Sequence, residues 1–273
     1  MSIRQTLERH NLRPDKRLSQ NFMVDPGTLA RMADAAELGS GDVVLEVGTG
    51  LGHLTRVLAG RAGRVVTVEV DERLVPVLRL ELVRYANVEL VAGDILALEP
   101  GHLVGDVPYK VVANVPYHIT SALVRHLLEC EQPPTLLVLT VQREVAERMA
   151  AKPGDMSLLA LGVQFYGTVK VVARLNPQVF YPRPGVESAI VRIEPHPTPM
   201  LPTNAREGFF RLARAGFGLK RKQLKNSLIA KLGLPGHQVL DWLAQAGVDP
   251  TRRAQTLSLD EWLALYDAFE PEG

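Results

Sequence analysis

The residues with the clearest chemical potential are Asn114-Val115-Pro116-Tyr117, which follow an apolar run at positions 111–113. An asparagine oxygen can accept a hydrogen bond from an amine on a flat ring. The residue before a proline is pushed toward an extended conformation, so its carbonyl can serve as a second acceptor. Tyr117 offers a face for a base, and such stacking is worth about 1–3 kcal/mol. The same four residues also fit a plain strand end followed by a proline turn.

A glycine-rich turn, Gly48-Thr49-Gly50-Leu51-Gly52, lies between an apolar run at 43–47 and a helical pattern at 53–59. Such a turn brings backbone close to a ligand, and an acidic residue about 20 positions later can bind ribose hydroxyls. Glu69 stands 21 positions after Gly48 and fits that role. Taken alone, the glycine-rich turn also fits a tight connection that binds no ligand. Taken alone, Glu69 also fits a solvated strand end.

The glycine spacing indicates the kind of nucleotide ligand. Dinucleotide sites use G-x-G-x-x-G, which lets a helix N-terminus face a pyrophosphate, whereas this chain has G-x-G-x-G. Glu46 precedes the first glycine by two residues. A carboxylate there would repel a pyrophosphate but suits a ligand with a cationic amino-acid end, such as S-adenosylmethionine. Asp94, after the third predicted strand, could accept a hydrogen bond from the adenine amine of that ligand.

An aromatic and proline-rich loop at 180–188 precedes the last predicted strand. Prolines reduce the freedom of a loop and so preset the position of a ring. Phe180 could therefore cover the second face of a base whose first face lies on Tyr117; an apolar plug is the alternative. A base in structured RNA must first be unstacked, at a cost of a few kcal/mol, and a two-faced clamp would offset that cost.

Strands and helices alternate along most of the chain. The predicted strands are 43–47, 64–70, 88–91, 110–114 and 135–142, and the predicted helices are 28–37, 53–59, 71–84, 120–131 and 143–151, with 158–165 as a possible continuation. This alternation predicts an α/β fold with a parallel sheet that binds ligands at the carboxyl ends of its strands. The glycine turn, Glu69, Asp94 and Asn114 all fall at such ends. Segments 169–175 and 188–193 are predicted to be antiparallel neighbours.

A second domain is predicted beyond residue 200. Prolines at 195, 197, 199 and 202 crowd a stretch without apolar period, which is typical of a linker. Apolar residues then recur at helical spacings and predict a small all-helical domain: Phe209, Phe210, Leu212, Phe217, Leu224, Leu228, Trp242, Leu243, Trp262, Leu263 and Leu265.

The composition excludes several classes of protein. No apolar stretch reaches the roughly 18 residues that span a bilayer, and the charged start of the chain lacks a signal core. Cys130 is the single cysteine of the 273 residues, which excludes a disulfide framework and a cysteine-based metal site. We therefore expect a cytoplasmic protein that has no membrane partner and no metal.

The net charge of +1 hides two basic stretches. Residues 1–20 carry five Arg or Lys and two Asp or Glu. Residues 206–225 carry seven Arg or Lys and one Glu. Two basic stretches on a mildly acidic remainder favour a polyanion partner. A solvated helix face is the alternative for the second stretch.

In order and spacing, the motifs of residues 16–193 resemble those of the ribosomal RNA adenine dimethylases. The resemblance rests on Gln20-Asn21-Phe22, Glu46 to Gly52, Val68-Glu69-Val70-Asp71, Gly93-Asp94-Ile95-Leu96, Asn114 to Tyr117, and Phe180-x-Pro-x-Pro-x-Val-x-Ser188. The stretch 215–226 is similar to the helical tail of the KsgA/RsmA branch. This resemblance implies a Rossmann-like class I methyltransferase fold with a mixed seven-stranded sheet. It divides the chain into a catalytic domain at 1–197, with 1–40 as arm and helices, and an RNA- and ribosome-binding domain at 198–273.

The resemblance also implies an activity and its residues. The activity is S-adenosylmethionine-dependent dimethylation of two adjacent adenines near the 3′ end of 16S rRNA in the 30S subunit, with a role in subunit biogenesis. It assigns cofactor binding to Asn21, Met23, Gly48, Gly50, Glu69, Asp94 and Asn114, and catalysis to Asn114, Pro116, Tyr117 and Phe180. RNA binding is expected at Arg13, Lys16, Arg17, Lys220, Arg221, Lys222 and Lys225, and the protein is expected to be a monomer.

Some residues depart from the family pattern, and other functions stay open. Thr49 stands where proline is common, Met23 where leucine is, and His118 where asparagine is. A nicotinamide-dependent oxidoreductase would share the sheet, but the glycine spacing and Glu46 argue against it. Two other functions stay open: a 23S rRNA dimethylase of the antibiotic-resistance type and a mainly non-catalytic ribosome-assembly factor.

Overall fold

The computed structural model describes residues 3–15 and 17–269. Its chain divides into two compact units, Met1–Ala146 with Thr168–Pro195 and Glu147–Gly167 with His196–Gly273. The division differs from the predicted one at 197, because residues 147–167 belong to the second unit although they precede the last strands. The functional assignment of the two predicted domains stays a prediction.

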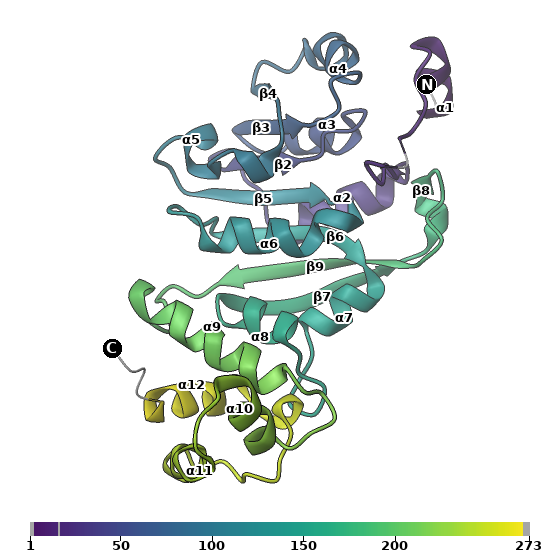
Figure 1. Cartoon of the computed structure of the whole chain (residues 1–273). Helices are drawn as coiled ribbons and strands as arrows, with labels where there is room; N and C mark the ends of the chain where they lie inside the picture. The colour runs from purple at the N-terminus through teal and green to yellow at the C-terminus, as the bar shows by residue number, and fades with distance from the viewer. Residues whose placement is uncertain (1–2, 16, 270–273) are drawn as a thin grey trace. The chain divides into compact units, whose positions relative to one another are not determined.

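A mixed seven-stranded sheet forms the centre of the first unit, in the order β4-β3-β2-β5-β6-β9-β7 (Figure 1). The strands are β2 (Val43–Val47), β3 (Arg64–Glu69), β4 (Val88–Ala92), β5 (Tyr109–Asn114), β6 (Leu136–Gln142), β7 (Gly167–Leu175) and β9 (Ser188–Pro195). The first five strands in this order, β4, β3, β2, β5 and β6, pair in parallel with their neighbours, and β9 pairs antiparallel with β6. The predicted α/β class and mixed sheet are confirmed, and β7 and β9 are neighbours.

A two-stranded sheet joins distant parts of the first unit. It pairs β1 (Phe22–Met23) antiparallel with β8 (Phe180–Tyr181). This pairing brings the N-terminal arm beside the proline-rich loop, which sequence patterns did not predict.

Helices connect the strands of the first unit, most of them as the alternation predicts. They are α1 (Ile3–Arg9), α2 (Pro26–Ala35), α3 (His53–Ala59), α4 (Val75–Leu82), α5 (Pro100–Val104), which was not predicted, and α6 (Thr120–Glu129), with 3₁₀ turns at Ile95–Ala97, Tyr117–Ile119 and Pro177–Val179. Helix α7 (Arg143–Met149) begins in the first unit and ends in the second. Helix α2 begins before its predicted start because the Asp25 side chain caps the Thr28 N–H at 2.7 Å and Pro26 suits a first turn. Helix α4 begins later than predicted, since residues before it form a turn closed by Leu74 N–H on the Asp71 carbonyl.

The apolar faces explain why these elements stay together. Buried side chains of α2, α3 and the central strands share one core, which includes Met32, Leu58, Val65, Val138 and Ile190. The arm has its own anchor, because Ile3, Leu7 and Phe22 pack against leucines of α4. A fully buried Leu-sized side chain contributes about 1.5–3 kcal/mol, so this anchor stabilises the arm.

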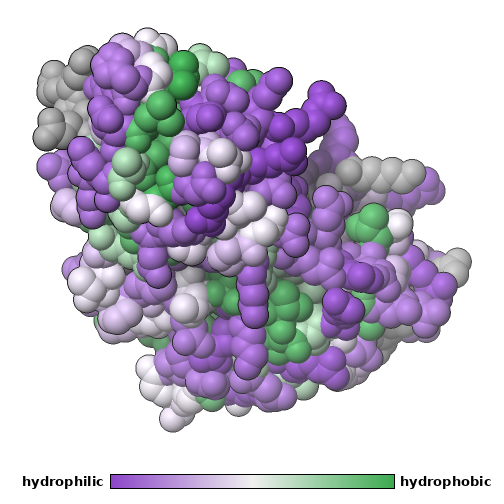
Figure 2. Space-filling view, turned by 90° about the horizontal axis from the view of Figure 1, so that it is seen from below, coloured by the Kyte–Doolittle hydropathy of each residue, from purple (hydrophilic) through white to green (hydrophobic). Residues whose placement is uncertain are grey.

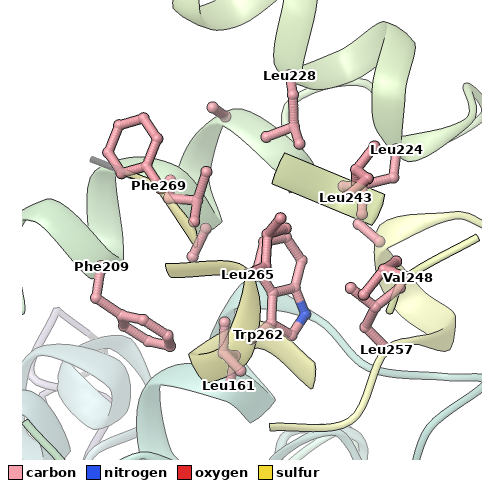
Figure 3. Close-up of a cluster of buried hydrophobic side chains, with 14 of the residues drawn as sticks. Leu161, Phe209, Leu224, Leu228, Leu243, Val248, Leu257, Trp262, Leu265 and Phe269 are labelled. Carbon is pink, nitrogen blue, oxygen red and sulfur yellow. The ribbon is translucent and has the colours of Figure 1, made fainter. Parts of the chain in front are cut away.

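The second unit is helical. It contains α8 (Leu158–Gln164), α9 (Thr203–Phe217), α10 (Leu224–Leu232), α11 (Gly236–Gln245) and α12 (Leu259–Ala268), with a 3₁₀ turn at Ala254–Thr256. Trp262 is fully buried in its core, beside Leu161, Leu224 and Leu257 (Figure 3). A Cβ on Gly216 would overlap the Trp262 ring, so α9 and α12 pack closely only with glycine there.

The surface is consistent with the composition. The face seen from below in Figure 2 is mostly hydrophilic, and hydrophobic residues are exposed on it only in small areas. Among the described helices, none has the length and apolar character needed to cross a membrane.

Candidate functional site

The strand ends of the first unit surround a cavity that we call the turn cavity. Four segments that sequence analysis singled out meet there, at residues 18–23, 48–51, 69–70 and 114–117. The predicted residues that line it are Asn21, Met23, Gly48, Gly50, Glu69, Asn114, Pro116 and Tyr117. The pairing of β3, β2 and β5 explains this meeting, because the carboxyl ends of parallel strands lie along one edge.

The glycine turn needs its glycines. Gly48, Gly50 and Gly52 have φ angles of +79°, +59° and +72°, which side-chain-bearing residues rarely adopt. A Cβ on Gly50 would lie 3.0 Å from the Phe22 ring, so the arm packs directly on the turn. The Gly48 N–H donates to the Val68 carbonyl at 2.9 Å and ties the turn to β3.

Glu69 lies at the end of β3 and holds the turn from the other side. Its Oε2 accepts from the Gly50 N–H at 2.7 Å, and its Oε1 accepts from the Asp71 N–H at 2.9 Å. Burial raises the pKa of this carboxyl. Each carboxylate oxygen has a further lone pair, so Glu69 can still accept hydrogen bonds from ligand hydroxyls.

Glu46 has a different role from the one that its position suggested. Its side chain is 0% exposed and does not line the turn cavity, so the structure does not support the predicted contact with a cationic ligand end. Its Oε2 accepts from the hydroxyls of Thr55 at 2.6 Å and Thr67 at 2.7 Å, and Thr67 in turn contacts the Thr49 hydroxyl at 2.7 Å. Glu46 thus connects β2, α3 and the glycine turn beneath the cavity.

The buried Glu46 should make stability depend on pH. Burial raises the pKa of Glu46 from 4.5 to about 8. Between these values the folded protein holds a proton that the unfolded chain has released, so stability is lost as pH rises through the window. We expect the free energy of unfolding to fall from pH 5 to pH 8. Glu46 should contribute up to about 1.4 kcal/mol per pH unit to this fall, and the Glu46→Gln variant should lack that contribution. Urea unfolding at several pH values measures it; equal slopes in both proteins would contradict this origin.

Asn114 ends β5, and its amide is oriented by the arm. Its Nδ2 donates to the backbone carbonyl of Asn21 at 2.9 Å. Because a carbonyl can only accept, the amide nitrogen must face Asn21, and Oδ1 is left to accept a hydrogen bond from a ligand. This is the orientation that acceptance of an amine hydrogen needs.

The tyrosine of the same motif is also held in place. The Tyr117 hydroxyl and the Ser188 hydroxyl lie 2.6 Å apart, and burial raises the pKa of Tyr117. The half-buried ring lines the turn cavity and is therefore available to a base. Ser188 was quoted in the resemblance but was not assigned this contact.

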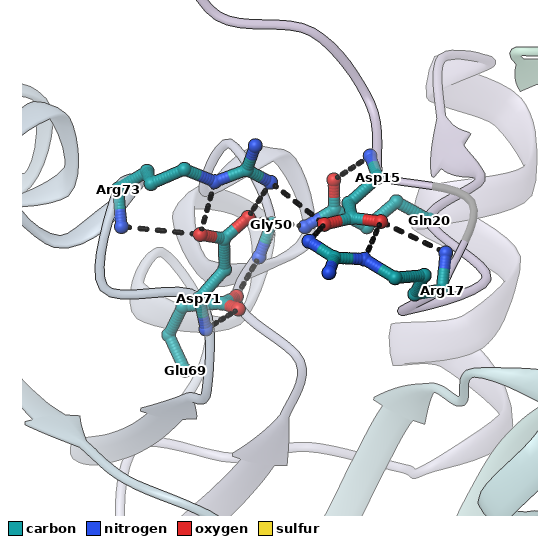
Figure 4. Close-up of polar contacts among 7 residues, drawn as sticks. All are labelled: Asp15, Arg17, Gln20, Gly50, Glu69, Asp71 and Arg73. Carbon is teal, nitrogen blue, oxygen red and sulfur yellow. Dashed lines mark hydrogen bonds and ion pairs between the residues drawn. The ribbon is translucent and has the colours of Figure 1, made fainter.

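Residues 15–21 are fastened to the edge of the sheet by a polar network (Figure 4). The Gln20 amide donates to Asp71 Oδ2 at 2.7 Å and accepts from the Asp15 N–H at 2.8 Å. Arg73 pairs with Asp71 at 2.6 Å and approaches Asp15 to 3.7 Å. The Arg73 guanidinium holds the pKa of Asp71 below its usual value. Sequence analysis did not identify Asp71 or Arg73 as the residues that fix the arm.

A larger cavity of about 1000 Å³, here called the arm cavity, adjoins the first. The two share Ser19, Gln20, Asn21 and Tyr117. The arm cavity is lined by α1 and the arm on one side and by residues 181–186 on the other, with Gln142 from the end of β6. A ligand group at Tyr117 can therefore reach both cavities.

Two predicted site residues lie elsewhere. Asp94 is exposed and caps the following turn through the Leu96 N–H at 3.0 Å, and it does not line the turn cavity. Phe180 is 2% exposed, packs in the core with Met23, and lines neither cavity. The geometry therefore gives no support to Phe180 as the second stacking ring, which stays an untested prediction.

The predicted RNA-binding residues occupy separate places. Arg13 lines the arm cavity, Arg17 pairs with Asp15 at 3.0 Å, and Lys16 lies outside the described residues. In the second unit, Lys220, Arg221 and Lys222 are exposed between α9 and α10, and Lys225 is half-buried in α10. No group of three or more His, Cys, Asp or Glu in the described part of the chain could hold a metal ion.

Comparisons with known proteins identify the family of the chain. A model of the ribosomal RNA adenine dimethylase family matches residues 11–270. The ribosomal RNA small subunit methyltransferase A of Dehalococcoides mccartyi (strain ATCC BAA-2266 / KCTC 15142 / 195) is 44% identical over 263 residues, which cover 96% of this chain and 90% of that protein. The protein of the same name from Pelotomaculum thermopropionicum is 40% identical and covers 99% of this chain and 96% of its own length.

Solved structures show the same fold. The 23S rRNA methyltransferase ErmE gives a TM-score of 0.75 at 33% identity, covering 91% of this chain and 99% of that chain. A dimethyladenosine transferase from Plasmodium falciparum gives a TM-score of 0.75 at 28% identity, and the match covers 88% of this chain and 94% of that chain.

Proposed function

Because the chain belongs to the ribosomal RNA adenine dimethylase family, an S-adenosylmethionine-dependent group of enzymes, we propose that it dimethylates the exocyclic amines of two adjacent adenines near the 3′ end of 16S rRNA. The observation that carries this proposal is the meeting of two cavities at Tyr117, beside Asn114 in the turn cavity. Relatives named for the small subunit reach 45% identity over 96% of the chain, against 33% for the 23S enzyme, which favours 16S over 23S rRNA.

The residues of the turn cavity fit S-adenosylmethionine. The glycines of the turn carry no side chains, so a nucleoside can approach the backbone. Glu69 would accept hydrogen bonds from the ribose hydroxyls, and the arm at Asn21 and Met23 would form the opposite wall. When bound, this cofactor supplies a methyl group that is already activated by its sulfonium. The protein therefore needs no strong base at this site.

Asn114 and its neighbour would present the adenine amine. The Asn114 Oδ1 would accept one amine hydrogen, since Nδ2 is bonded to Asn21. The Pro116 carbonyl already accepts from the Ile119 N–H at 3.1 Å, which favours the Val115 carbonyl as the second acceptor. Two acceptors draw the nitrogen toward tetrahedral geometry and aim its lone pair at the methyl group. Tyr117 would stack on the base, so the contribution of the protein is orientation and electrostatics.

The wider proposals concern partner and place. The substrate would be the 30S subunit in the cytoplasm, bound by a monomer, and binding would also serve subunit biogenesis. Transfer to under-methylated small subunits with tritiated S-adenosylmethionine tests the activity, and primer extension locates the two adenines. Incorporation into large-subunit RNA instead would overturn the assignment to 16S rRNA.

The basic stretch of the second unit should set the salt dependence of RNA binding. Cations that contact phosphates release counterions, so each contributes about 0.7 to the slope of log affinity against log salt for single-stranded RNA. We expect the combined change of Lys220, Arg221, Lys222 and Lys225 to glutamine to reduce the slope by up to about 3. Filter binding to small subunits over a salt series measures this. Lys152 and Lys170, also exposed, are the control positions, and an unchanged slope in the fourfold variant would exclude the stretch from the interface.

A further inference from the structure

The arm cavity offers more space than a single presented base requires. Its volume is about 1000 Å³, and it opens from Tyr117, where the proposed mechanism places the target adenine. The nucleotide next to the target adenine in the RNA strand must extend away from Tyr117. Because the turn cavity would hold the cofactor, the arm cavity is the remaining adjoining space.

Tyr181 is the aromatic side chain that faces this space. Successive side chains of a strand point to opposite faces. In β8, Phe180 points into the core at 2% exposure, and Tyr181 is 37% exposed and lines the arm cavity. Within residues 3–15 and 17–269, no aromatic ring packs against Tyr181, and its exposure at the cavity lets it contact a base there.

Gln142 supplies a polar group at the inner end of the cavity. It is the last residue of β6, pairs with Ser188 across the sheet, and is half-buried. Ser188 in turn contacts Tyr117 at 2.6 Å, so Gln142 lies one residue pair from the proposed stacking ring. Its amide has no hydrogen-bond partner in the described part of the chain and offers one acceptor and two donors. That combination matches the N6 amine and N7 of adenine.

The charges around the cavity suit a nucleic-acid strand. Arg13 and Arg183 both line the cavity and are exposed, with Glu8 as the carboxylate in the lining. The loop that carries Arg183 is fixed near its end, because the Arg143 N–H donates to the Glu187 carbonyl at 2.9 Å. Phosphates on either side of a base in the cavity would therefore meet cations on both walls.

We propose that the arm cavity binds the base next to the adenine being methylated, with Tyr181 stacked on it and Gln142 bonded to its adenine edge. The inference rests on the proposed function and adds the second base of the substrate. It makes Gln142 the residue that selects adenine as the neighbouring base, and Tyr181 the residue that holds this base by stacking. A polar edge contact lets the site reject bases that cannot pair with the Gln142 amide.

The test measures kcat/KM per target adenine on small subunits whose 16S RNA has either two adjacent adenines or one adenine beside uracil. The wild-type enzyme should prefer the adjacent-adenine substrate about 10-fold or more, because an edge contact of this kind is worth about 1–3 kcal/mol of discrimination against the wrong base. Gln142→Ala should lose most of this preference. Tyr181→Ala should keep the preference but lower kcat/KM on both substrates by about 10-fold or more, since every base can stack on the ring, whereas Tyr181→Phe should keep both. Unchanged S-adenosylhomocysteine binding in the variants shows that the turn cavity is intact.

The outcomes separate the two proposals. Retention of the full wild-type preference by Gln142→Ala, or unchanged kcat/KM on both substrates in Tyr181→Ala, would overturn the role of the arm cavity while the proposed function stands. Absence of any preference in the wild-type enzyme would do the same. Absence of transfer to every small-subunit substrate would overturn the proposed function, and this inference with it.

Discussion

Replacement of Asn114 by alanine is expected to lower kcat for methyl transfer by about 10²–10³-fold, the usual cost of losing one oriented hydrogen-bonding group. The side chain has two partners of opposite kind: Nδ2 donates to the Asn21 carbonyl, and Oδ1 would accept from the adenine amine. Alanine removes both. Binding of S-adenosylhomocysteine should fall much less, because Glu69 and the glycine turn remain. Single-turnover assays and calorimetry measure the two effects separately.

A matched variant separates orientation from simple loss of contact. Asn114→Asp keeps the size and an acceptor but replaces the donor that faces the Asn21 carbonyl, so two acceptors would oppose each other. We expect turnover between those of the alanine variant and the wild type. Near-wild-type turnover in Asn114→Ala would show that the amine is presented by other groups.

Replacement of Glu69 by glutamine should weaken S-adenosylhomocysteine binding by about 10²-fold. Both oxygens of Glu69 accept from backbone N–H groups, of Gly50 and Asp71, so an amide must turn its NH₂ toward one of these donors. That clash loosens the turn and removes one acceptor for the ribose, and a buried unsatisfied donor costs about 1–3 kcal/mol. Calorimetric titration measures the affinity.

The control for Glu69 lies on the neighbouring strand. Glu89 in β4 is half-exposed and pairs with Arg64 at 2.8 Å, so Glu89→Gln removes a surface charge without touching the turn cavity. It should leave cofactor affinity within a factor of two. RNA binding should be unchanged in both variants, and equal loss of cofactor affinity in both would point to a general effect of charge.

The sequence predicted which strand ends carry the site, because the alternation of strands and helices along the chain alone predicts a parallel sheet. Once β2, β3 and β5 are placed side by side, the residues at their ends must meet, and eight predicted residues line one cavity. The loop and arm residues among them were identified through the family resemblance. This part of the prediction depended on chain order and not on the direction of individual side chains.

Side-chain direction is where prediction failed or lacked support. Glu46 lies within a strand whose two faces are both buried, so its position beside the glycines did not reveal that it points beneath the turn. Phe180 and Tyr181 form a strand of two residues, too short for any alternation to show which ring faces the core. In both cases the answer depends on contacts with distant segments, α3 for Glu46 and the arm for Phe180.

The wall formed by residues 18–23 has a practical consequence for anyone who expresses or shortens this gene product. Everything that defines the sheet lies after residue 40, so a chain started at α2 would keep its catalytic motifs and could still fold. It would nevertheless have a methyl-donor site open on one side and an Asn114 amide free to flip. Versions made for expression, and fusion tags, should therefore leave the first two dozen residues intact, and a soluble but inactive truncation should not be taken as proof against the activity.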